Sequence, residues 1–389
     1  MDFRFTVEQE KFRKEVADFL KDEISKGLWK PSCDAWIQGQ DPAFTKRIAE
    51  RGWIGLSWPK ELGGGGRSAV DRMIMTEEML RYGAPAACHW FADRQIGNAI
   101  IHYGNEEQKK EWLPMIMRGE AYVGLGLSEP DAASDLASIK TKATETVDGY
   151  IIDGQKVWTS CAKYMNYIYL IVRTDPLVPK HKGCSEFFFS TKLPGVTLTP
   201  TIDITGGEAW CETFLDQVKV PKTSLIGEKN KGFYQVVNQL DYERAGLERL
   251  MGNYVLYDAI IQFTKETKRN GQPLCKEPSI RGKLAQLQIE LEVGRLLTYR
   301  VALVIDEKRA PNLEASMAKV YSTAYEQHLA TLAMEILGLY GSLMEDSKYA
   351  AIHGLAPASF LGSKGYSLQA GTSEILRNII AQRGLGLPA

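Results

Sequence analysis

The stretch Tyr167-Ile168-Tyr169-Leu170-Ile171-Val172 decides the fold class of this chain. Aromatic and β-branched residues follow one another there without a polar break, which favours a β-strand. Similar runs lie nearby, separated by Gly and Pro turns: Tyr150-Ile151-Ile152, Phe187-Phe188-Phe189 and Gly195-Val196-Thr197-Leu198. The sequence therefore predicts a β domain over residues 119–231, built as a small antiparallel barrel or a sandwich.

Both flanks of this β domain show helical spacing of apolar residues instead. In residues 1–118 the pattern includes Phe12, Val16, Phe19 and Leu20. After residue 232 long helical segments are predicted, enough for a four-helix bundle: Phe233 to Lys268, Ile280 to Asp306 and Leu313 to Leu337. The prediction is a mainly α protein with a β domain, in three parts: an N-terminal helical domain (1–118), a middle β domain (119–231) and a C-terminal helical bundle (232–389).

Composition and charge narrow the functional class. The 389 residues carry a net charge of -1 with Lys and Arg scattered, so the sequence predicts no surface for nucleic acid or an anionic membrane. No export signal or membrane-spanning apolar stretch is evident, and we expect a cytoplasmic protein. The six cysteines form no Cys-x-x-Cys pair and the five histidines lack metal-ligand spacing, which argues against a metal site.

A second informative stretch, near the C-terminus, is Leu368-Gln369-Ala370-Gly371-Thr372-Ser373-Glu374-Ile375. It resembles the Tyr-Glu-Gly-Thr-x-x-Ile segment of the acyl-CoA dehydrogenase family, whose order of helical, β and helical domains also matches all 389 residues. The resemblance implies FAD as cofactor, bound by Gly371, Thr372 and Glu374. Ala370 stands where the family carries the glutamate that removes the substrate α-proton. The resemblance implies that the main-chain N–H of Ala370 still binds the thioester oxygen.

Two stretches of the β domain carry the same resemblance. Gly126-Leu127-Ser128-Glu129-Pro130-Asp131-Ala132-Ala133-Ser134-Asp135 resembles the Ser/Thr-Glu-Pro loop of the family, which implies FAD contacts from Leu127, Ser128 and Ser134. Gln155-Lys156-Val157-Trp158-Thr159-Ser160 resembles its Lys-x-Trp-Ile-Thr segment. By that resemblance Trp158 lies against the flavin ring and the Ser160 hydroxyl reaches flavin N5.

Two further stretches depart from the family pattern. Residues 333–341 resemble Met-Gln-x-Leu-Gly-Gly-x-Gly, which meets the FAD of a neighbouring subunit and implies contacts from Glu335 and Gly338. Residues 267–274 have lost the Arg and Phe of the family's Arg-x-x-Phe-Gly-x-Pro-Leu. Either Lys268 or Arg269 replaces the lost contact, or the two are ordinary cations at a helix end.

Without a glutamate at position 370, the base must come from elsewhere. Glu243 shares a helical face with Leu240, Leu247 and Leu250, which predicts an acid directed at apolar surface, where burial would raise its pKa. Its position resembles the one from which isovaleryl-CoA and long-chain acyl-CoA dehydrogenases supply their base. The structural alternatives are an internal ion pair with Arg244 or a charge near a helix N-terminus that favours the helix dipole. Asp241 and Arg244 match family positions near the substrate pocket.

Asp93 is the second candidate base. Ile96 and Ile100 follow it at helical spacing, so this acid also lies on an apolar face; an N-cap or a pair with Arg94 is the structural alternative. An aspartate in this stretch, with no glutamate before Gly-Thr, resembles cyclohex-1-ene-1-carboxyl-CoA dehydrogenase, in which an aspartate takes a proton from ring carbon C3 while hydride leaves C6. Trp90 and Phe91 would suit a ring-shaped acyl group; the alternative is that they are ordinary core residues of a helix.

The leading hypothesis is an FAD-dependent acyl-CoA dehydrogenase that takes a cyclic CoA thioester and passes electrons to electron-transfer flavoprotein. One alternative is ordinary α,β-dehydrogenation of a branched or other acyl-CoA with Glu243 as base. Another is a non-catalytic FAD-binding subunit of a mixed tetramer, and a third is an oxygen-using flavin enzyme. We expect a homotetramer, with the mixed tetramer as the alternative.

Overall fold

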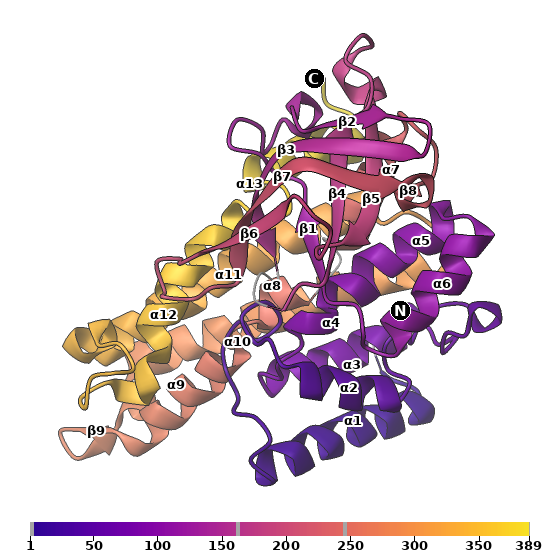
Figure 1. The fold of residues 1–389 in the computed structure, drawn as a ribbon. Coiled ribbons are helices and arrows are strands. Elements are labelled where there is room, and N and C mark those ends of the chain that lie inside the picture. Colours follow the sequence, from indigo (N-terminus) through magenta and orange to yellow (C-terminus); the bar gives the residue numbers. More distant parts are fainter. Residues whose placement is uncertain (1–3, 161–163, 244–246, 389) are drawn as a thin grey trace. The chain divides into compact units, whose positions relative to one another are not determined.

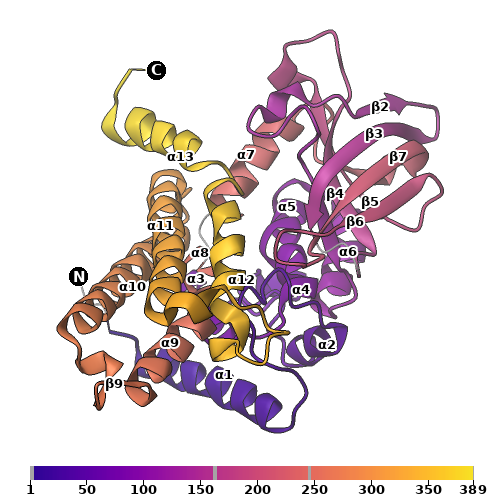
Figure 2. The same cartoon turned by 90° about the vertical axis from the view of Figure 1, so that its left-hand side faces the viewer.

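The computed structural model describes residues 4–160, 164–243 and 247–388, and for residues 241–243 it describes the backbone alone. The chain forms two compact units, each described by itself below, and Figures 1 and 2 show its helices and strands. One, here called the sheet unit, comprises Ile37–Arg67 and Pro85–Glu243. The other, here called the helical unit, comprises Met1–Trp36, Ser68–Ala84 and Arg244–Ala389.

The sheet unit contains an eight-stranded sheet in the order β6-β7-β3-β2-β4-β5-β8, with β1 paired to β4. Most neighbours are antiparallel, as predicted, but β1 and β2 both pair with β4 in parallel, which the residue pattern could not indicate because it carries no strand direction. The strands are β1 (Val123–Gly126), β2 (Lys142–Glu145), β3 (Gly149–Ser160), β4 (Tyr167–Arg173), β5 (Cys184–Ser190), β6 (Val196–Thr201), β7 (Trp210–Pro221) and β8 (Leu225–Ile226).

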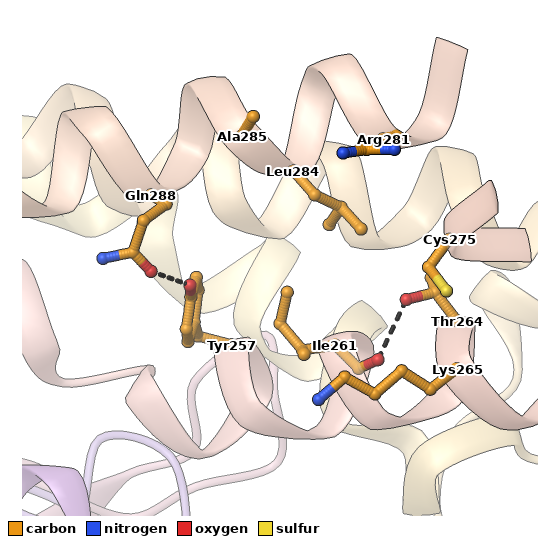
Figure 3. Close-up of a pocket in the computed structure, with 9 residues that line it drawn as sticks. All are labelled: Tyr257, Ile261, Thr264, Lys265, Cys275, Arg281, Leu284, Ala285 and Gln288. Atoms are coloured by element: carbon orange, nitrogen blue, oxygen red, sulfur yellow. Dashed lines mark hydrogen bonds between the residues drawn. The ribbon is translucent and has the colours of Figure 1, made fainter. Parts of the chain in front are cut away.

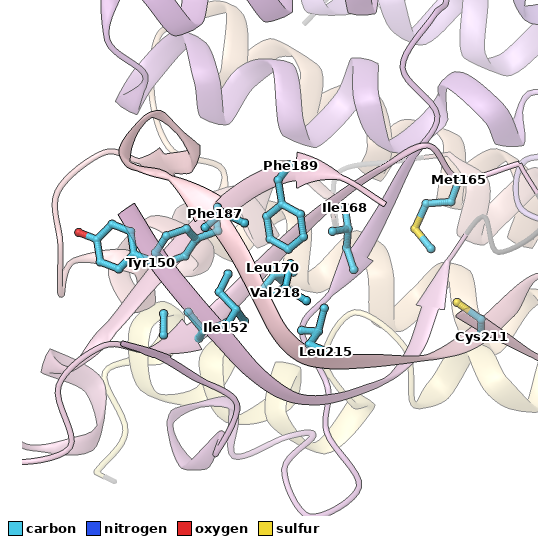
Figure 4. Packing of buried hydrophobic residues seen from close by; sticks show 13 residues of the cluster. Tyr150, Ile152, Met165, Ile168, Leu170, Phe187, Phe189, Cys211, Leu215 and Val218 are labelled. Carbon is cyan, nitrogen blue, oxygen red and sulfur yellow. The ribbon is translucent and has the colours of Figure 1, made fainter. Parts of the chain in front are cut away.

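The central strand β4 is buried on both faces, which explains its unbroken apolar run. Ile168 and Leu170 pack with Phe187 of β5 in the main core of the sheet (Figure 4). Ile171 packs instead with Val236 of α7 (Gly232–Glu243). Since neighbouring side chains of a strand point to opposite faces, helix α7 covers the face away from the main core.

Helices from residues 1–118 contribute to both units. The sheet unit holds α2 (Pro42–Glu50), α4 (Ala87–Phe91), α5 (Gly97–Tyr103) and α6 (Glu106–Met117). A π-helical turn, Ala92–Ile96, joins α4 directly to α5. The helical unit holds α1 (Val7–Ser25) and α3 (Ala69–Arg81). The Glu77 carboxylate on α3 lies 3.1 Å from Arg13 on α1 and 2.6 Å from Arg295 on α10 (Pro278–Asp306).

The remaining helices of the helical unit form its bundle. Its two longest helices, α10 and α11, pack through Val301, Ala315 and Ala318. Within the described residues, no helix combines the length and apolar character that a membrane span requires. The elements are α8 (Glu248–Met251), α9 (Tyr254–Glu266), the hairpin of β9 (Lys268–Arg269) and β10 (Gln272–Pro273), α10 (Pro278–Asp306), α11 (Asn312–Leu337), α12 (Leu355–Gly362) and α13 (Ser373–Ile379).

The long helical segment predicted from Phe233 to Lys268 is divided in the structure into α7, α8 and α9. Between α8 and α9, the Asn253 backbone N and Nδ2 donate to the Glu326 carboxylate of α11 at 3.2 and 2.8 Å. Both side chains are fully buried. The break is therefore stabilised by a partner distant in sequence, which helical periodicity cannot reveal.

Candidate active site

In the sheet unit, the loop after β1 is held by a buried ion pair. Lys156 Nζ lies 2.8 Å from Glu129 Oε1 and also donates to the backbone oxygen of Leu127 at 3.3 Å. The Ser128 backbone oxygen accepts from Val157 N at 2.9 Å. The predicted cofactor residues Leu127 and Ser128 are thus fastened to strand β3.

Neither member of this pair was assigned a role from the sequence. Burial alone would raise the pKa of Glu129, but Lys156 and the backbone donors of the loop outweigh it and lower the pKa below its ordinary value. Burial lowers the pKa of Lys156 to about 8, against the opposing effect of Glu129. An ion pair this deeply buried is stable only when both charged groups also make their hydrogen bonds to the loop backbone. The pair therefore fixes the loop in one position.

Trp158 is presented by an irregularity in strand β3. The pairing of β3 with β7 shifts register between Lys156 and Thr159, and Trp158 adopts a left-handed φ of 58°. Its side chain is 56% exposed, with Trp210 at its edge, 6.3 Å between ring centroids. A large indole held out by a bulge suits stacking against a flat ligand.

The two predicted serines lie in different surroundings. Ser160 is buried at the end of β3, where it pairs with Trp210 in register, two residues beyond Trp158. Ser134 lies exposed in the loop that follows β1. The sheet unit thus places Ser160 next to the bulge, and Ser134 stays a cofactor contact by prediction.

Asp93 lies on the π-helical turn between α4 and α5 and is 5% exposed. Its Oδ1 accepts a hydrogen bond from Gly55 N at 2.7 Å. Ile96 and Ile100 are fully buried, as expected for an apolar helical face. Trp90 and Phe91 are buried in α4, and their role in substrate binding stays a prediction.

The C-terminal turn lies in the helical unit. Ala370 and Gly371 have φ angles of 52° and 91°, so both backbones are left-handed. The Thr372 hydroxyl then caps helix α13 by accepting from Ile375 N at 3.2 Å. Glu374 is exposed in the first turn of α13, and backbone and Thr372 hydrogen bonds lower its pKa. A sharp turn that opens into a capped helix is therefore present where the motif indicated it.

The predicted contacts to a neighbouring subunit lie at the surface of the helical unit. Glu335 is exposed on α11 and pairs with Lys283 of α10 at 2.5 Å. Gly338 ends α11 with a left-handed φ of 58°. Arg269 of the hairpin lies 3.0 Å from Glu277, which favours the reading of this cation as part of a surface pair. Arg244 and the side chains of Asp241 and Glu243 lie outside the described residues.

A separate cavity of about 280 Å³ lies between α9 and α10 in the helical unit (Figure 3). Tyr257, Cys275 and Gln288 are among its lining residues, and the Tyr257 hydroxyl is hydrogen-bonded to Gln288. None of the residues predicted for cofactor or substrate contributes to this cavity.

Each unit, taken by itself, carries residues that suit the flavin that the resemblance implies. The exposed indole of Trp158 on its bulge offers a stacking face, and the fastened loop at Leu127 and Ser128 offers backbone groups beside it. In the helical unit, Gly371 is half-buried and has a left-handed backbone, where a side chain would be disfavoured.

Comparison with known proteins settles the family. Residues 6–120, 124–218 and 230–385 match the N-terminal, middle and C-terminal domains described as acyl-CoA dehydrogenase. The chain is 31% identical to acyl-CoA dehydrogenase FadE26 of Mycobacterium tuberculosis, over 100% of this chain and 99% of the relative.

Similarity to solved structures supports the same family. A structure titled Tcur3481-Tcur3483 steroid ACAD superposes with a TM-score of 0.89 at 30% identity, and a chain of the ChsE4-ChsE5 complex from Mycobacterium tuberculosis with 0.88 at 31%, each over 100% of both chains. The predicted fold, with helical, β and helical domains in that order, is confirmed. The chain belongs to the acyl-CoA dehydrogenase family and is an FAD-dependent oxidoreductase acting on CH–CH groups of acyl-CoA.

Proposed function

We propose that this enzyme oxidises a CoA thioester whose acyl group contains a ring, with a proton acceptor other than the glutamate usual in the family. The observation that carries this proposal is the turn at Ala370, which keeps the sharp left-handed backbone but has no carboxylate. The favoured substrate is of the cyclohex-1-ene-1-carboxyl-CoA type. A solved relative titled a steroid ACAD supports a cyclic acyl group as well.

Asp93 is the proposed base for such a substrate. Its carboxylate is buried, and the hydrogen bond from Gly55 N fixes its direction and favours the ionised form that a base requires. In the proposed reaction Asp93 takes a proton from ring carbon C3, and the electron pair of that C–H bond forms a C2=C3 double bond. The pair of the original C1=C2 bond shifts to C1=C6 as the C6–H bond breaks, which gives a conjugated diene. FAD, when bound, would supply the two-electron acceptor for the hydride that leaves C6, so that the substrate is oxidised by two electrons.

Glu243 is the alternative base, for ordinary α,β-dehydrogenation. Its place on α7, the helix that ends the sheet unit, resembles the position used by isovaleryl-CoA dehydrogenase. Activation of the thioester by the Ala370 N–H would serve either base. The difference lies in the carbon that loses its proton. Substrate choice and variant activity can therefore separate the two.

The assembly is part of the proposal. Two solved relatives carry titles that name two different chains, Tcur3481-Tcur3483 and ChsE4-ChsE5. These titles favour a mixed tetramer as the specific alternative to the homotetramer, and in such an assembly this chain could serve as a FAD-binding subunit without turnover of its own. Electron-transfer flavoprotein is the proposed acceptor.

The test is anaerobic bleaching of the flavin absorbance of the purified protein by acyl-CoAs. The panel contains straight-chain, branched, cyclohexane- and cyclohexene-carboxyl, and steroid side-chain thioesters. We expect fastest bleaching by a cyclic thioester. If no thioester bleaches the flavin of the protein alone, but bleaching occurs after co-purification with a second subunit, the mixed assembly replaces the homotetramer.

The variants Asp93→Asn and Glu243→Gln assign the base. Asparagine keeps an oxygen that can accept from Gly55 N, so Asp93→Asn removes the charge with little change in packing. We expect it to slow bleaching by about a hundredfold or more. If Asp93→Asn retains full activity while Glu243→Gln abolishes it, the remote-proton reaction is wrong and the α,β reaction stands.

A further inference from the structure

A buried lysine side chain donates hydrogen bonds to the backbone on both sides of Ala370. Lys319 of α11 is 1% exposed, and its Nζ donates to the backbone oxygens of Tyr366 at 2.8 Å and Gly371 at 2.9 Å. These two carbonyls lie at opposite ends of the turn. A single ammonium group therefore ties together the residues that precede and follow Gln369 and Ala370.

A second buried cation reaches the same turn from α8. Arg249 is 3% exposed, and its Nη1 donates to Gln369 Oε1 at 3.0 Å. Its guanidinium carbon lies 4.9 Å from the centroid of the Trp36 ring and 5.7 Å from that of Tyr366. The guanidinium therefore lies within cation–π distance of two aromatic rings while it binds the residue directly before Ala370.

Ala370 needs such support because its backbone is unfavourable by itself. Its φ of 52° lies in the left-handed region, which residues other than glycine adopt only where the surroundings impose it. The anchored groups are its two chain neighbours, the side chain of Gln369 and the carbonyl of Gly371. The direction of the Ala370 N–H depends on both of them.

We propose that Arg249 and Lys319 are positioning residues that hold the Ala370 turn in its left-handed form, so that the Ala370 N–H is aimed at the thioester carbonyl. The inference rests on the proposed function of that N–H. The Arg249 contact depends on a residue in which this chain departs from the family motif, because Gln369 supplies an amide oxygen where the motif has a tyrosine. Two buried positive charges at the turn would also favour negative charge that develops on the thioester oxygen.

The variant Gln369→Met tests the Arg249 contact without removing a buried charge. Methionine has a similar length but offers no carbonyl acceptor, whereas Gln369→Glu keeps one. We expect Gln369→Met to lower kcat about tenfold or more, to leave the melting temperature within about 2 °C, and to keep the FAD content. Gln369→Glu should retain most of the activity. The matched control is Gln286→Met, on the exposed face of α10.

Amide hydrogen exchange over residues 366–372 provides a readout that does not depend on turnover. In Gln369→Met and in Lys319→Met we expect exchange there to rise about tenfold or more, and in the control not at all. Unchanged exchange would overturn the proposal, and so would faster exchange with unchanged kcat. If the wild-type protein is bleached by no thioester, the proposed function fails, whereas the exchange result still decides whether the two cations hold the turn.

Discussion

Two residues of the candidate active site, Trp158 and Ala370, have left-handed backbones although neither is glycine. An L-residue pays about 1–2 kcal/mol for this conformation. Such strain is retained when the surrounding structure fixes it, and it concentrates at functional sites. The left-handed backbone of Trp158 turns the indole outward. That of Ala370 gives a sharp turn whose main chain can face a ligand.

The variant Ala370→Gly should stabilise the protein, or at least cost nothing. Glycine adopts a φ of 52° without strain, and this gain of about 1–2 kcal/mol exceeds the roughly 0.5–1 kcal/mol of extra chain entropy that glycine loses on folding. The free energy of unfolding is measured by chemical denaturation. Ala285→Gly, at an exposed position inside α10, is the control and should cost about 1 kcal/mol. Equal losses in both variants would show that Ala370 is not strained.

Sequence motifs found the strained residues but not the charges that hold them. Trp158 and Ala370 belong to short signatures that can be read directly from the chain. Lys156, Lys319 and Arg249 were not predicted as functional, because a lone charged residue in a helix or strand is usually exposed, and only tertiary contacts reveal that these three are buried.

At the scale of elements, the π-helical turn and the loop at Gly55 form one assembly that carries Asp93. Gly97, directly after the turn, packs so closely on Trp58 that a Cβ atom would lie 1.9 Å from Trp58 Cζ2. Trp58 is 1% exposed, so it cannot move aside without disturbing the close packing around it. The small residue at position 97 therefore allows the helix to approach the loop that binds Asp93.

The variant Gly97→Ala should be destabilised by about 1–3 kcal/mol or more, although alanine is the better helix former. The matched control is Gly282→Ala in α10, where a Cβ would meet nothing within 4 Å and a gain of about 1 kcal/mol is expected. Opposite signs in thermal denaturation of the two variants confirm the packing argument. A stabilised Gly97→Ala would contradict it.

The buried ion pair of the loop after β1 makes a second prediction at this scale. Lys156→Met leaves the Glu129 carboxylate buried without its cation, so a loss of about 3–5 kcal/mol is expected. The double variant Lys156→Met/Glu129→Gln should recover part of it, and the exposed pair variant Lys14→Met should change stability by less than about 1 kcal/mol. Because the loop carries Leu127 and Ser128, the FAD content of the single variant should also fall. If Lys156→Met is as stable as the double variant or more stable, the uncompensated Glu129 carboxylate is not the cause of the loss.

Element types were more predictable than their grouping. The predicted strands at Tyr150, Tyr167, Phe187 and Val196 all exist, because their apolar runs reflect local burial. The division of the N-terminal helices between two units could not be read from the pattern. It depends on long-range contacts such as the pair of Glu77 with Arg295, which helical periodicity does not encode.

At the scale of the whole molecule, each unit buries an acid whose pKa is raised. In the sheet unit, burial raises the pKa of Glu186 to about 8, against hydrogen bonds from Tyr169, Gln235 and Gln239. In the helical unit, burial and then Asp34 raise the pKa of Glu326 well above its ordinary value, against hydrogen bonds from Asn253. With a pKa of about 8, Glu186 is mostly protonated in the folded protein at neutral pH, while the unfolded chain loses this proton above about pH 4.5.

The sign of the resulting pH dependence follows from proton uptake on folding. Between about pH 4.5 and 8 the folded state binds more protons than the unfolded state, so the contribution of Glu186 to stability is complete below pH 4.5 and is lost as pH rises through 8, at up to about 1.4 kcal/mol per pH unit. Lys156 acts in the opposite direction. Burial lowers its pKa to about 8, so above that pH its unfavourable contribution is relieved until its unfolded value near 10.5 is reached.

The variant Glu186→Gln isolates the first of these effects. Glutamine keeps an oxygen acceptor and removes the titrating proton, so the fall in unfolding free energy between pH 5 and 8 should become shallower by up to about 1.4 kcal/mol per pH unit. Chemical denaturation at several pH values measures this slope, with the exposed Glu111→Gln as a control for the loss of one carboxyl group. A slope equal to that of the wild type would mean that Glu186 is ionised in the folded protein. The network of Tyr169, Gln235 and Gln239 would then bind a carboxylate, and its hydrogen bonds would outweigh burial.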